Sequence, residues 1–297
     1  MTPPALHSSI GLVGGHAATD HVPSTVAPAP AEAPAPAPVR RSRGRRLHPA
    51  WGLLLPVLAL AAVEALVRVG TVPAHLLPPP SEIAATLAQL AQTDLLWHVL
   101  ASSLRVAAGY AAGALLGIVI GAAVGLDARI ATLLDPTFQA LRAVPSLAWV
   151  PLLLLWLGID EAPKLVLIAI GAFFPVYMGA ASGIAGVDRK LVEVGRLYRL
   201  SGAALAWRVL LPAALPSLLT GLRNGLSLAW MFMVAAELIA ASKGLGYLLS
   251  DGRETGRADI VLAAILLLAL LGKASDTLMR RLEIRLLAWR DDLARSA

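Results

Sequence analysis

Apolar runs long enough to cross a lipid bilayer recur along this 297-residue chain, and they decide its fold class. A helix needs about 20 consecutive apolar residues to cross roughly 30 Å of hydrocarbon. Hydrophobic residues make up 57% of the chain and charged residues only 15%, whereas soluble domains usually carry about 25% charged residues. The sequence therefore predicts an all-α, polytopic membrane protein rather than a soluble enzyme.

Six transmembrane helices are expected, and the basic residues orient them. The spans cover 49–69, 105–126, 138–158, 163–185, 217–240 and 258–279. Arginines cluster before the first span, in the 186–212 loop and after the last span. Cytoplasmic segments carry the excess of Lys and Arg, so both termini are expected in the cytoplasm, an N-in/C-in topology.

Three segments are expected along the chain. Residues 1–48 form a Pro/Ala-rich tail that ends in an arginine cluster, and this composition predicts disorder because it cannot bury a core. Residues 49–290 form the membrane domain, and 291–297 form a C-terminal tail. The arginine cluster sets topology and could also bind anionic membrane lipid. Because the basic residues flank apolar runs, no nucleic acid is expected as a partner.

Glycines and prolines indicate how the spans pack. Glycines recur every four residues in the second span, from Gly109 to Gly125. Such a row lets another helix approach closely, either as fixed packing or as a sliding contact during gating. The third span holds Pro145 and Pro151, which predict a kinked helix, either beside a pathway or for packing alone.

Ionisable residues inside spans usually face the bundle interior or water. Each one here is either part of a structural ion pair or a contact for the substrate. A guanidinium binds anions in a planar, bidentate way, so Arg223 is the leading candidate for an anionic substrate. Glu237 and Lys273 carry opposite charges and could be neighbours. The candidate pathway residues are Pro145, Pro151, Arg223, Asn224 and Glu237.

No catalytic or metal-binding pattern is present. The six histidines lack metal-ligand spacing, and the absence of cysteine excludes thiol chemistry. The chain also lacks the G-x-x-x-x-G-K-[ST] phosphate loop. We therefore expect a protein that is not an enzyme, binds no metal or cofactor, and draws on ATP only through a partner.

The 186–212 loop carries a patterned polar segment. It resembles the cytoplasmic "EAA" coupling motif of binding-protein-dependent ABC importer permeases, E-A-A-x-x-x-G followed by nine residues and I-x-L-P. In such permeases the segment forms two short helices that lie in a groove of the ATPase subunit. The matching positions, and so the expected coupling residues, are Glu193, Val194, Gly195, Arg196, Arg199, Gly202, Val209, Leu211 and Pro212.

One position departs from this pattern. Arg199 stands where the family has the glycine that makes the turn between the two short helices. A residue other than glycine is strained there if its φ is positive. We expect Gly202, three residues later, to take over the turn.

The resemblance extends over roughly residues 50–290. Blocks at 142–145, 151–161, 236–237 and 244–248 look like the nitrate/sulfonate/taurine branch, and Gly158 to Ala162 looks most like aliphatic-sulfonate permeases. It implies a permease in the bacterial inner membrane that imports a small organosulfonate. Its implied partners are cytoplasmic ATPase subunits, an external substrate-binding protein and a second permease copy. Nitrate and taurine permeases of the same branch, and an ion-coupled secondary transporter, are the alternatives.

Overall fold

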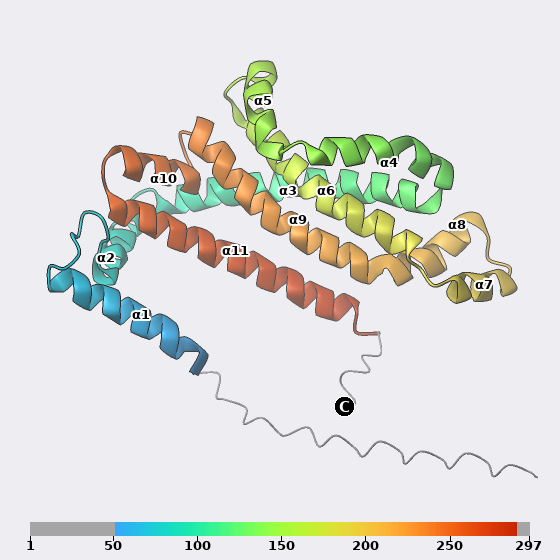
Figure 1. The fold of residues 1–297 in the computed structure, drawn as a ribbon, viewed down its shortest axis with the longest axis horizontal. Coiled ribbons are helices and arrows are strands. Elements are labelled where there is room, and N and C mark those ends of the chain that lie inside the picture. The colour runs from blue at the N-terminus through green and yellow to red at the C-terminus, as the bar shows by residue number, and fades with distance from the viewer. Residues whose placement is uncertain (1–50, 290–297) are drawn as a thin grey trace, which may run out of the picture. The chain divides into compact units, whose positions relative to one another are not determined.

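The computed structural model describes residues 51–289, and within that range the chain is helical with no strand (Figure 1). The predicted N-terminal tail and C-terminal tail lie outside the described residues. The elements in chain order are α1 (Trp51–Arg68), α2 (Pro80–Ala91), α3 (Leu95–Leu126), α4 (Ala128–Ala143), η1 (Ser146–Trp149), α5 (Val150–Leu157), α6 (Glu161–Ala185), α7 (Arg189–Leu197), α8 (Gly202–Leu205), η2 (Ala206–Leu210), α9 (Leu211–Ala240), α10 (Leu245–Glu254) and α11 (Ala258–Leu286).

Four helices in the described range are long and apolar enough to cross a membrane. They are α3, α6, α11 and the continuous helix Gly202–Ala240, which contains α9. A fifth span results if α4 and the stretch η1–α5, which are bent relative to each other, are counted as one. The structure thus confirms a polytopic helical protein but not the expected number of six spans.

The expected third span, 138–158, is not one kinked helix. The chain bends by 87° between α4 and η1–α5. Pro145 lies at this break, and Val144 before it is extended at φ −75° and ψ 123°, as the residue preceding a proline prefers. Pro151 lies in the first turn of α5, where its missing N–H breaks no helical bond. The first proline therefore ends a helix, and the second helps to begin one.

The glycine row of α3 lies against α6. A Cβ on Gly113 would meet the backbone carbonyl of Ala169, and one on Gly121 would lie 2.6 Å from the carbonyl oxygen of Tyr177. Gly109 lies next to Ile168, near the start of α6, and Gly125 lies next to Ile184, near its end. The two helices therefore run in the same direction. The row serves close helix packing along its whole length.

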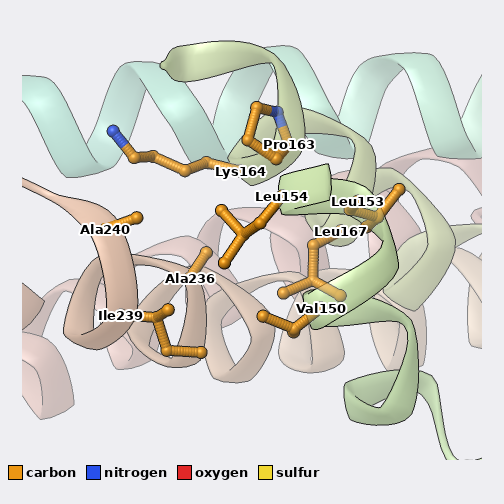
Figure 2. A pocket seen from close by; sticks show the side chains of 9 residues that line it. All are labelled: Val150, Leu153, Leu154, Pro163, Lys164, Leu167, Ala236, Ile239 and Ala240. Atoms are coloured by element: carbon orange, nitrogen blue, oxygen red, sulfur yellow. The ribbon is translucent and has the colours of Figure 1, made fainter. Parts of the chain in front are cut away.

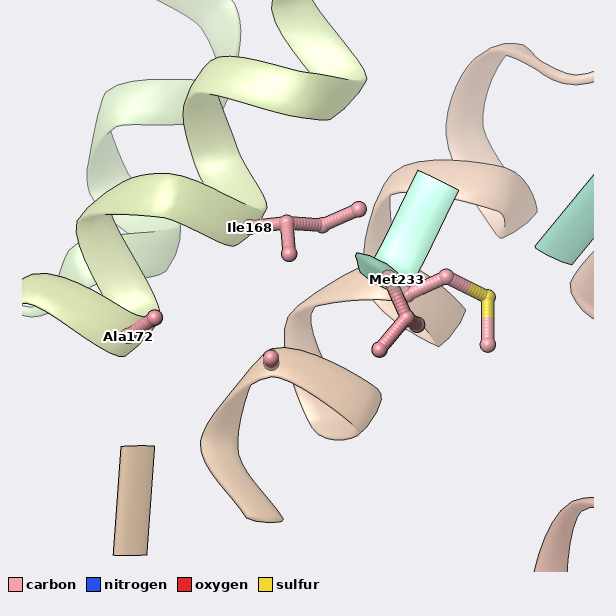
Figure 3. Close-up of a cluster of buried hydrophobic side chains, with 5 residues drawn as sticks. Ile168, Ala172 and Met233 are labelled. Carbon is pink, nitrogen blue, oxygen red and sulfur yellow. The ribbon is translucent and has the colours of Figure 1, made fainter. Parts of the chain in front are cut away.

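Helices α6 and α9 pack through glycines and a small apolar core. A Cβ on Gly221 would lie 2.7 Å from the carbonyl oxygen of Pro175. Ile168 and Ala172 of α6 meet Met233 of α9, and all three side chains are fully buried (Figure 3). Because α6 contacts both α3 and α9, it forms the centre of the bundle.

Two boundaries on the side of α3 differ from the expectation. The helix starts at Leu95 rather than at 105, and a separate helix, α2, ends at Ala91. The composition of residues 82–98, which follow the prolines at 78–80, predicts one amphipathic surface helix, whereas the structure ends that helix at Ala91 and begins α3 at Leu95. The first turns of α3 carry polar side chains, which pattern reasoning excludes from a span. As shown below, these side chains are paired inside the protein.

Candidate functional site: the coupling segment and a buried ion network

Residues 188–212 form α7, a turn, α8, η2 and the first two residues of α9, and they follow the end of α6 (Figure 1). Asp188 caps α7, and its carboxylate accepts a hydrogen bond of 2.9 Å from the backbone N–H of Lys190. Such a cap satisfies one of the free donors at a helix start. We call residues 188–212 the coupling segment.

Gly195 is the point where the two arms of the coupling segment meet. It is buried, and a Cβ there would lie 2.7 Å from Cδ1 of Leu205 and 3.2 Å from Cγ2 of Val209. A larger side chain would push the arms apart. This explains a small residue at the position where the family pattern has alanine.

Arg199 itself makes the turn after α7. Its φ is +58°, the only positive φ of a non-glycine residue in the described range. The N–H of Arg199 donates to the carbonyl of Arg196 at 2.8 Å, and the N–H of Leu200 donates to that of Gly195 at 3.1 Å. This pair of bonds is the Schellman arrangement, in which the left-handed residue is usually glycine. The expectation that Gly202 replaces it is wrong; Gly202 adds a second left-handed residue at φ +51°.

Pro212, the last residue of the coupling segment, does not terminate the helix. It lies in the first turn of α9, and the helix from Gly202 to Ala240 is continuous. Proline has no N–H to donate to the carbonyl four residues earlier, that of Arg208. The preceding turn, η2, is a π-helix, and Arg208 lies within it. The coupling segment is therefore continuous with a membrane-spanning helix.

An apolar stripe is exposed on the coupling segment. Leu197 and Tyr198 are 82% and 79% exposed, and Trp207 is 73% exposed. Glu193, Arg196 and Arg199 are exposed around them. Exposed apolar groups with a charged rim are typical of a surface that binds another protein. The further exposed apolar residues of this surface are Leu191 and Val194.

The candidate pathway residues do not gather at one place. Arg223 and Glu237 lie on the same helix 14 residues apart, which is about 21 Å at 1.5 Å per residue. Arg223 is engaged by α11, because its Nε donates to Oδ1 of Asp276 at 2.6 Å. Asn224 next to it is exposed. Pro145 and Pro151 lie at the bend and in the helix after it, as described above.

Glu237 is the centre of a buried ion network near the end of α9. It is 1% exposed, and its carboxylate accepts from Arg105 Nη1 at 2.7 Å, from Ser102 Oγ at 2.8 Å and from the N–H of Gly246 at 2.8 Å. Its charge partner is Arg105 of α3 and not Lys273. A buried carboxylate is tolerated only when it is paired in this way.

Arg105 joins this carboxylate to a second one. Its Nε and Nη2 donate to the two carboxylate oxygens of Glu161 at 2.6 and 2.7 Å. Its Nη1 also donates to the backbone carbonyl of Lys243 at 2.6 Å. Lys164 donates to Glu161 at 3.1 Å. We call Ser102, Arg105, Glu161, Lys164 and Glu237 the ion network.

The loop after α9 is fastened to the same network. Gly244 donates its N–H to Nδ1 of His98 at 3.0 Å, and the N–H of Leu245 donates to Oγ of Ser102 at 2.8 Å. Gly244 has a φ of +132°, and a Cβ there would collide with the carboxylate of Glu237. The sequence blocks at 236–237 and 244–248 are therefore parts of one structure.

Sequence reasoning identified Glu237 but missed the rest of the network. Arg105 lies 132 positions from Glu237 and 56 from Glu161, so no local pattern links them. The one available sign was a charged residue at the edge of an apolar run. Residues 51–289 contain no group of His, Cys, Asp or Glu placed to hold a metal ion.

Comparisons with known proteins agree with this architecture. A solved structure titled as inward facing conformations of the MetNI methionine ABC transporter has a chain that matches with a TM-score of 0.54 at 18% identity, over 65% of this chain and 98% of that one. At this identity the likeness shows the fold alone.

Sequence relatives are more similar. The Putative aliphatic sulfonates transport permease protein SsuC of Bacillus subtilis (strain 168) is 43% identical over 256 residues, which cover 85% of this chain and 92% of the relative. The protein of the same name from Escherichia coli (strain K12) is 42% identical, over 79% of this chain and 90% of the relative. The Taurine transport system permease protein TauC of that organism is 38% identical, over 73% and 81%.

A family model described as "Binding-protein-dependent transport system inner membrane component" matches residues 113–287, which include α6, the coupling segment, α9 and Glu237. The relatives named above span most of the chain at the same time. This protein therefore belongs to the family of inner membrane components of binding-protein-dependent transport systems, and it is a multi-pass ABC transporter permease of the bacterial inner membrane.

Proposed function

We propose that this permease imports a small anion, with an aliphatic sulfonate as its first candidate cargo. The observation that carries this proposal is the identity of 43% and 42% to two relatives named as aliphatic sulfonate permeases, over most of their length. Taurine and nitrate are the second candidates. They are favoured by the taurine relative and by the Nitrate import permease protein NrtB of Leptolyngbya laminosa, 34% identical over 62% of this chain and 66% of that protein.

The energy for import is supplied by a partner that hydrolyses ATP. The chain has no phosphate loop, and we assign it no ATPase site, cofactor or metal of its own. The exposed apolar stripe and charged rim of the coupling segment are suited to bind cytoplasmic ATPase subunits. Because η2 continues into α9, closure of the ATPases would move a membrane span.

A second permease copy would enclose the pathway. The exposed side of α9 carries polar residues three or four positions apart, namely Ser217, Thr220, Asn224 and Ser227. Residues at this spacing share one face of a helix. Polar side chains avoid lipid, so this face favours water or another copy of the chain. An external binding protein would deliver the cargo, and lipid would cover the apolar sides.

An ion-coupled secondary transporter is less well supported. Such a protein needs a titratable group that meets the coupling ion near the pathway. Glu237 is the buried carboxylate suited to that role, but three donors already occupy it. Lys273, which was considered as its partner, is exposed on α11.

The test is co-purification and uptake with a Glu193→Arg variant. We expect the wild-type chain to retain its ATPase subunit and to import sulfonate, whereas the variant loses both, because the exposed carboxylate at the coupling surface is reversed. Uptake of aliphatic sulfonate, taurine and nitrate by the wild-type complex identifies the cargo. Import of nitrate alone would overturn sulfonate, and normal assembly and uptake in the variant would overturn the coupling role.

A further inference from the structure

We propose that Arg105 and Lys164 form an anion-binding subsite that Glu161 occupies when no anion is bound. The subsite lies at the start of α6, whereas the coupling segment follows the other end of that helix. The proposal rests on the proposed function, that the cargo is a small anion. It adds the residues that would receive the charged group.

The two cations are buried while their partner is exposed. The side chains of Arg105 and Lys164 are 10% and 6% exposed, whereas that of Glu161 is 55% exposed. The guanidinium of Arg105 donates to both carboxylate oxygens of Glu161. The ammonium of Lys164 donates to one of the same two oxygens. This planar donor set fits any anion that offers two oxygens on one centre, such as a sulfonate or nitrate.

An open hollow gives an anion access to Lys164 and to Glu161, whose carboxylate in turn binds Arg105. It has a volume of about 650 Å³, and its polar lining residues are Asp160, Glu161, Lys164 and Ser242. The apolar lining residues are Ile159, Ala162, Ala240 and Ala241. Glu161 is the first residue of α6, so its side chain lies at a helix end and borders the hollow directly. Its carboxylate can turn into this space without disturbing the helix.

Directly beside the hollow lies a narrow apolar crevice, which shares Lys164 and Ala240 with it. Val150, Leu153 and Ile239 line it, and its volume is only about 10 Å³, which holds at most one water. Figure 2 shows the side chain of Lys164 extending over the crevice towards Ala240. The subsite would therefore hold an anion in the polar hollow, because the crevice beside it is too narrow and too apolar to receive one.

Charge balance favours an exchange at Glu161 and not at Glu237. The charges of Arg105, Lys164, Glu161 and Glu237 cancel, and loss of Glu161 leaves a net +1, which suits one monovalent anion. Glu237 has a side chain that is 0% exposed and holds three donors, so it stays in place. Glu161 acts as a tethered competitor, and tethering gives it a high effective concentration. Neutralising it should therefore tighten anion binding.

The test measures binding of methanesulfonate and of nitrate to the purified full-length permease in nanodiscs, at constant ionic strength. We expect Glu161→Gln to bind both anions at least about 10-fold more tightly than the wild type. Lys164→Met should abolish this gain in the double variant. Asp160→Asn is the matched control, because it removes an equal charge from the same hollow without touching Arg105.

An unchanged Kd in Glu161→Gln would overturn the subsite, and so would an equal gain in Asp160→Asn. Should Glu161→Gln fold poorly, Glu161→Ser takes its place with the same expected gain. Uptake by the complete transporter separates this proposal from the proposed function. If the wild-type complex imports neither sulfonate, taurine nor nitrate while Glu161→Gln still binds methanesulfonate, the cargo is wrong and the subsite stands. If uptake is normal and no variant changes the Kd, only the subsite fails.

Discussion

The coupling segment and the ion network lie at opposite ends of α6 and are built on opposite plans. At the coupling segment, apolar side chains such as Leu197 and Trp207 face outward, and a left-handed arginine makes the turn. At the ion network, every charge is paired, and no buried side-chain polar atom in the described residues lacks a hydrogen-bond partner. The coupling segment thus exposes apolar side chains that have no partner within the described residues, whereas the ion network pairs its charges within the chain.

This difference shows which end depends on another protein for its stability. Exposed apolar surface contributes favourable free energy only when a partner buries it away from water. Paired buried charges, in contrast, hold three helices and a loop together without a partner. Substitutions at the ion network should therefore damage the chain itself, whereas substitutions at the coupling segment should damage its assembly.

The largest effect is expected from Arg105→Ala. The variant leaves the fully buried Glu237 without its charge partner, and breaking such a pair costs about 3–5 kcal/mol of the free energy of unfolding. Arg223→Ala is the matched control, because its pair with Asp276 is 38% and 27% exposed. We expect it to cost about 1 kcal/mol or less. Denaturant unfolding in mixed micelles measures both, and equal losses would show that burial does not set the difference.

A smaller loss is expected from Gly244→Ala. An alanine at φ +132° is strained by about 1–3 kcal/mol, and its Cβ also meets the carboxylate of Glu237. Gly256→Ala provides the control, since that glycine has a φ of +67° but open space around it. We expect the control to lose about 1 kcal/mol. If the two variants unfold alike, the loop is not held by the ion network.

At the coupling segment, Arg199→Gly should make the isolated chain more stable. Glycine accepts the φ of +58° without strain, so we expect a gain of about 0.5–1 kcal/mol in the free energy of unfolding. Arg196→Gly, in the last turn of α7, should instead lose up to about 1 kcal/mol because glycine has a low helix propensity. A loss in both variants would mean that Arg199 makes contacts that offset its strain.

The smallest effect on stability is expected from Leu197→Asp. This side chain is 82% exposed, and surface changes usually alter the free energy of unfolding by less than about 0.5 kcal/mol. The same unfolding measurement checks it. A loss above about 2 kcal/mol would mean that the stripe packs within the chain and is not a free surface.

Sequence reasoning recovered the parts of the molecule that depend on local pattern. The apolar run at 163–185 falls within α6, and the run that begins at 258 gives the start of α11. The first ten residues of α3 were missed because they include the polar residues His98 and Ser102. These side chains are paired with Gly244 and Glu237, which lie far away in the sequence. The sequence predicted a kink at Pro145, but one helix ends there and a new helix begins at a large angle to it.

The candidate site was recovered in the same uneven way. The resemblance to the family motif predicted two short helices at the coupling segment, but it misplaced the turn, because the conformation of Arg199 depends on the two bonds that close the end of α7. The charge on Arg223 was recognised, but not its pair with Asp276 on another helix. Distant pairing is the information that a single sequence does not contain.

The account depends most on the claim that the coupling segment is an open surface completed by an ATPase. Two exposed tryptophans test it directly, Trp207 on the coupling segment at 73% exposure and Trp289 after α11 at 61%. Removing a central tryptophan from an interface typically costs at least 2 kcal/mol, or about 30-fold in affinity. We predict that Trp207→Ala loses about that much affinity for the ATPase subunit in a pull-down titration, while Trp289→Ala and the stability of both variants stay unchanged. Equal ATPase binding by Trp207→Ala and the wild type would contradict the claim.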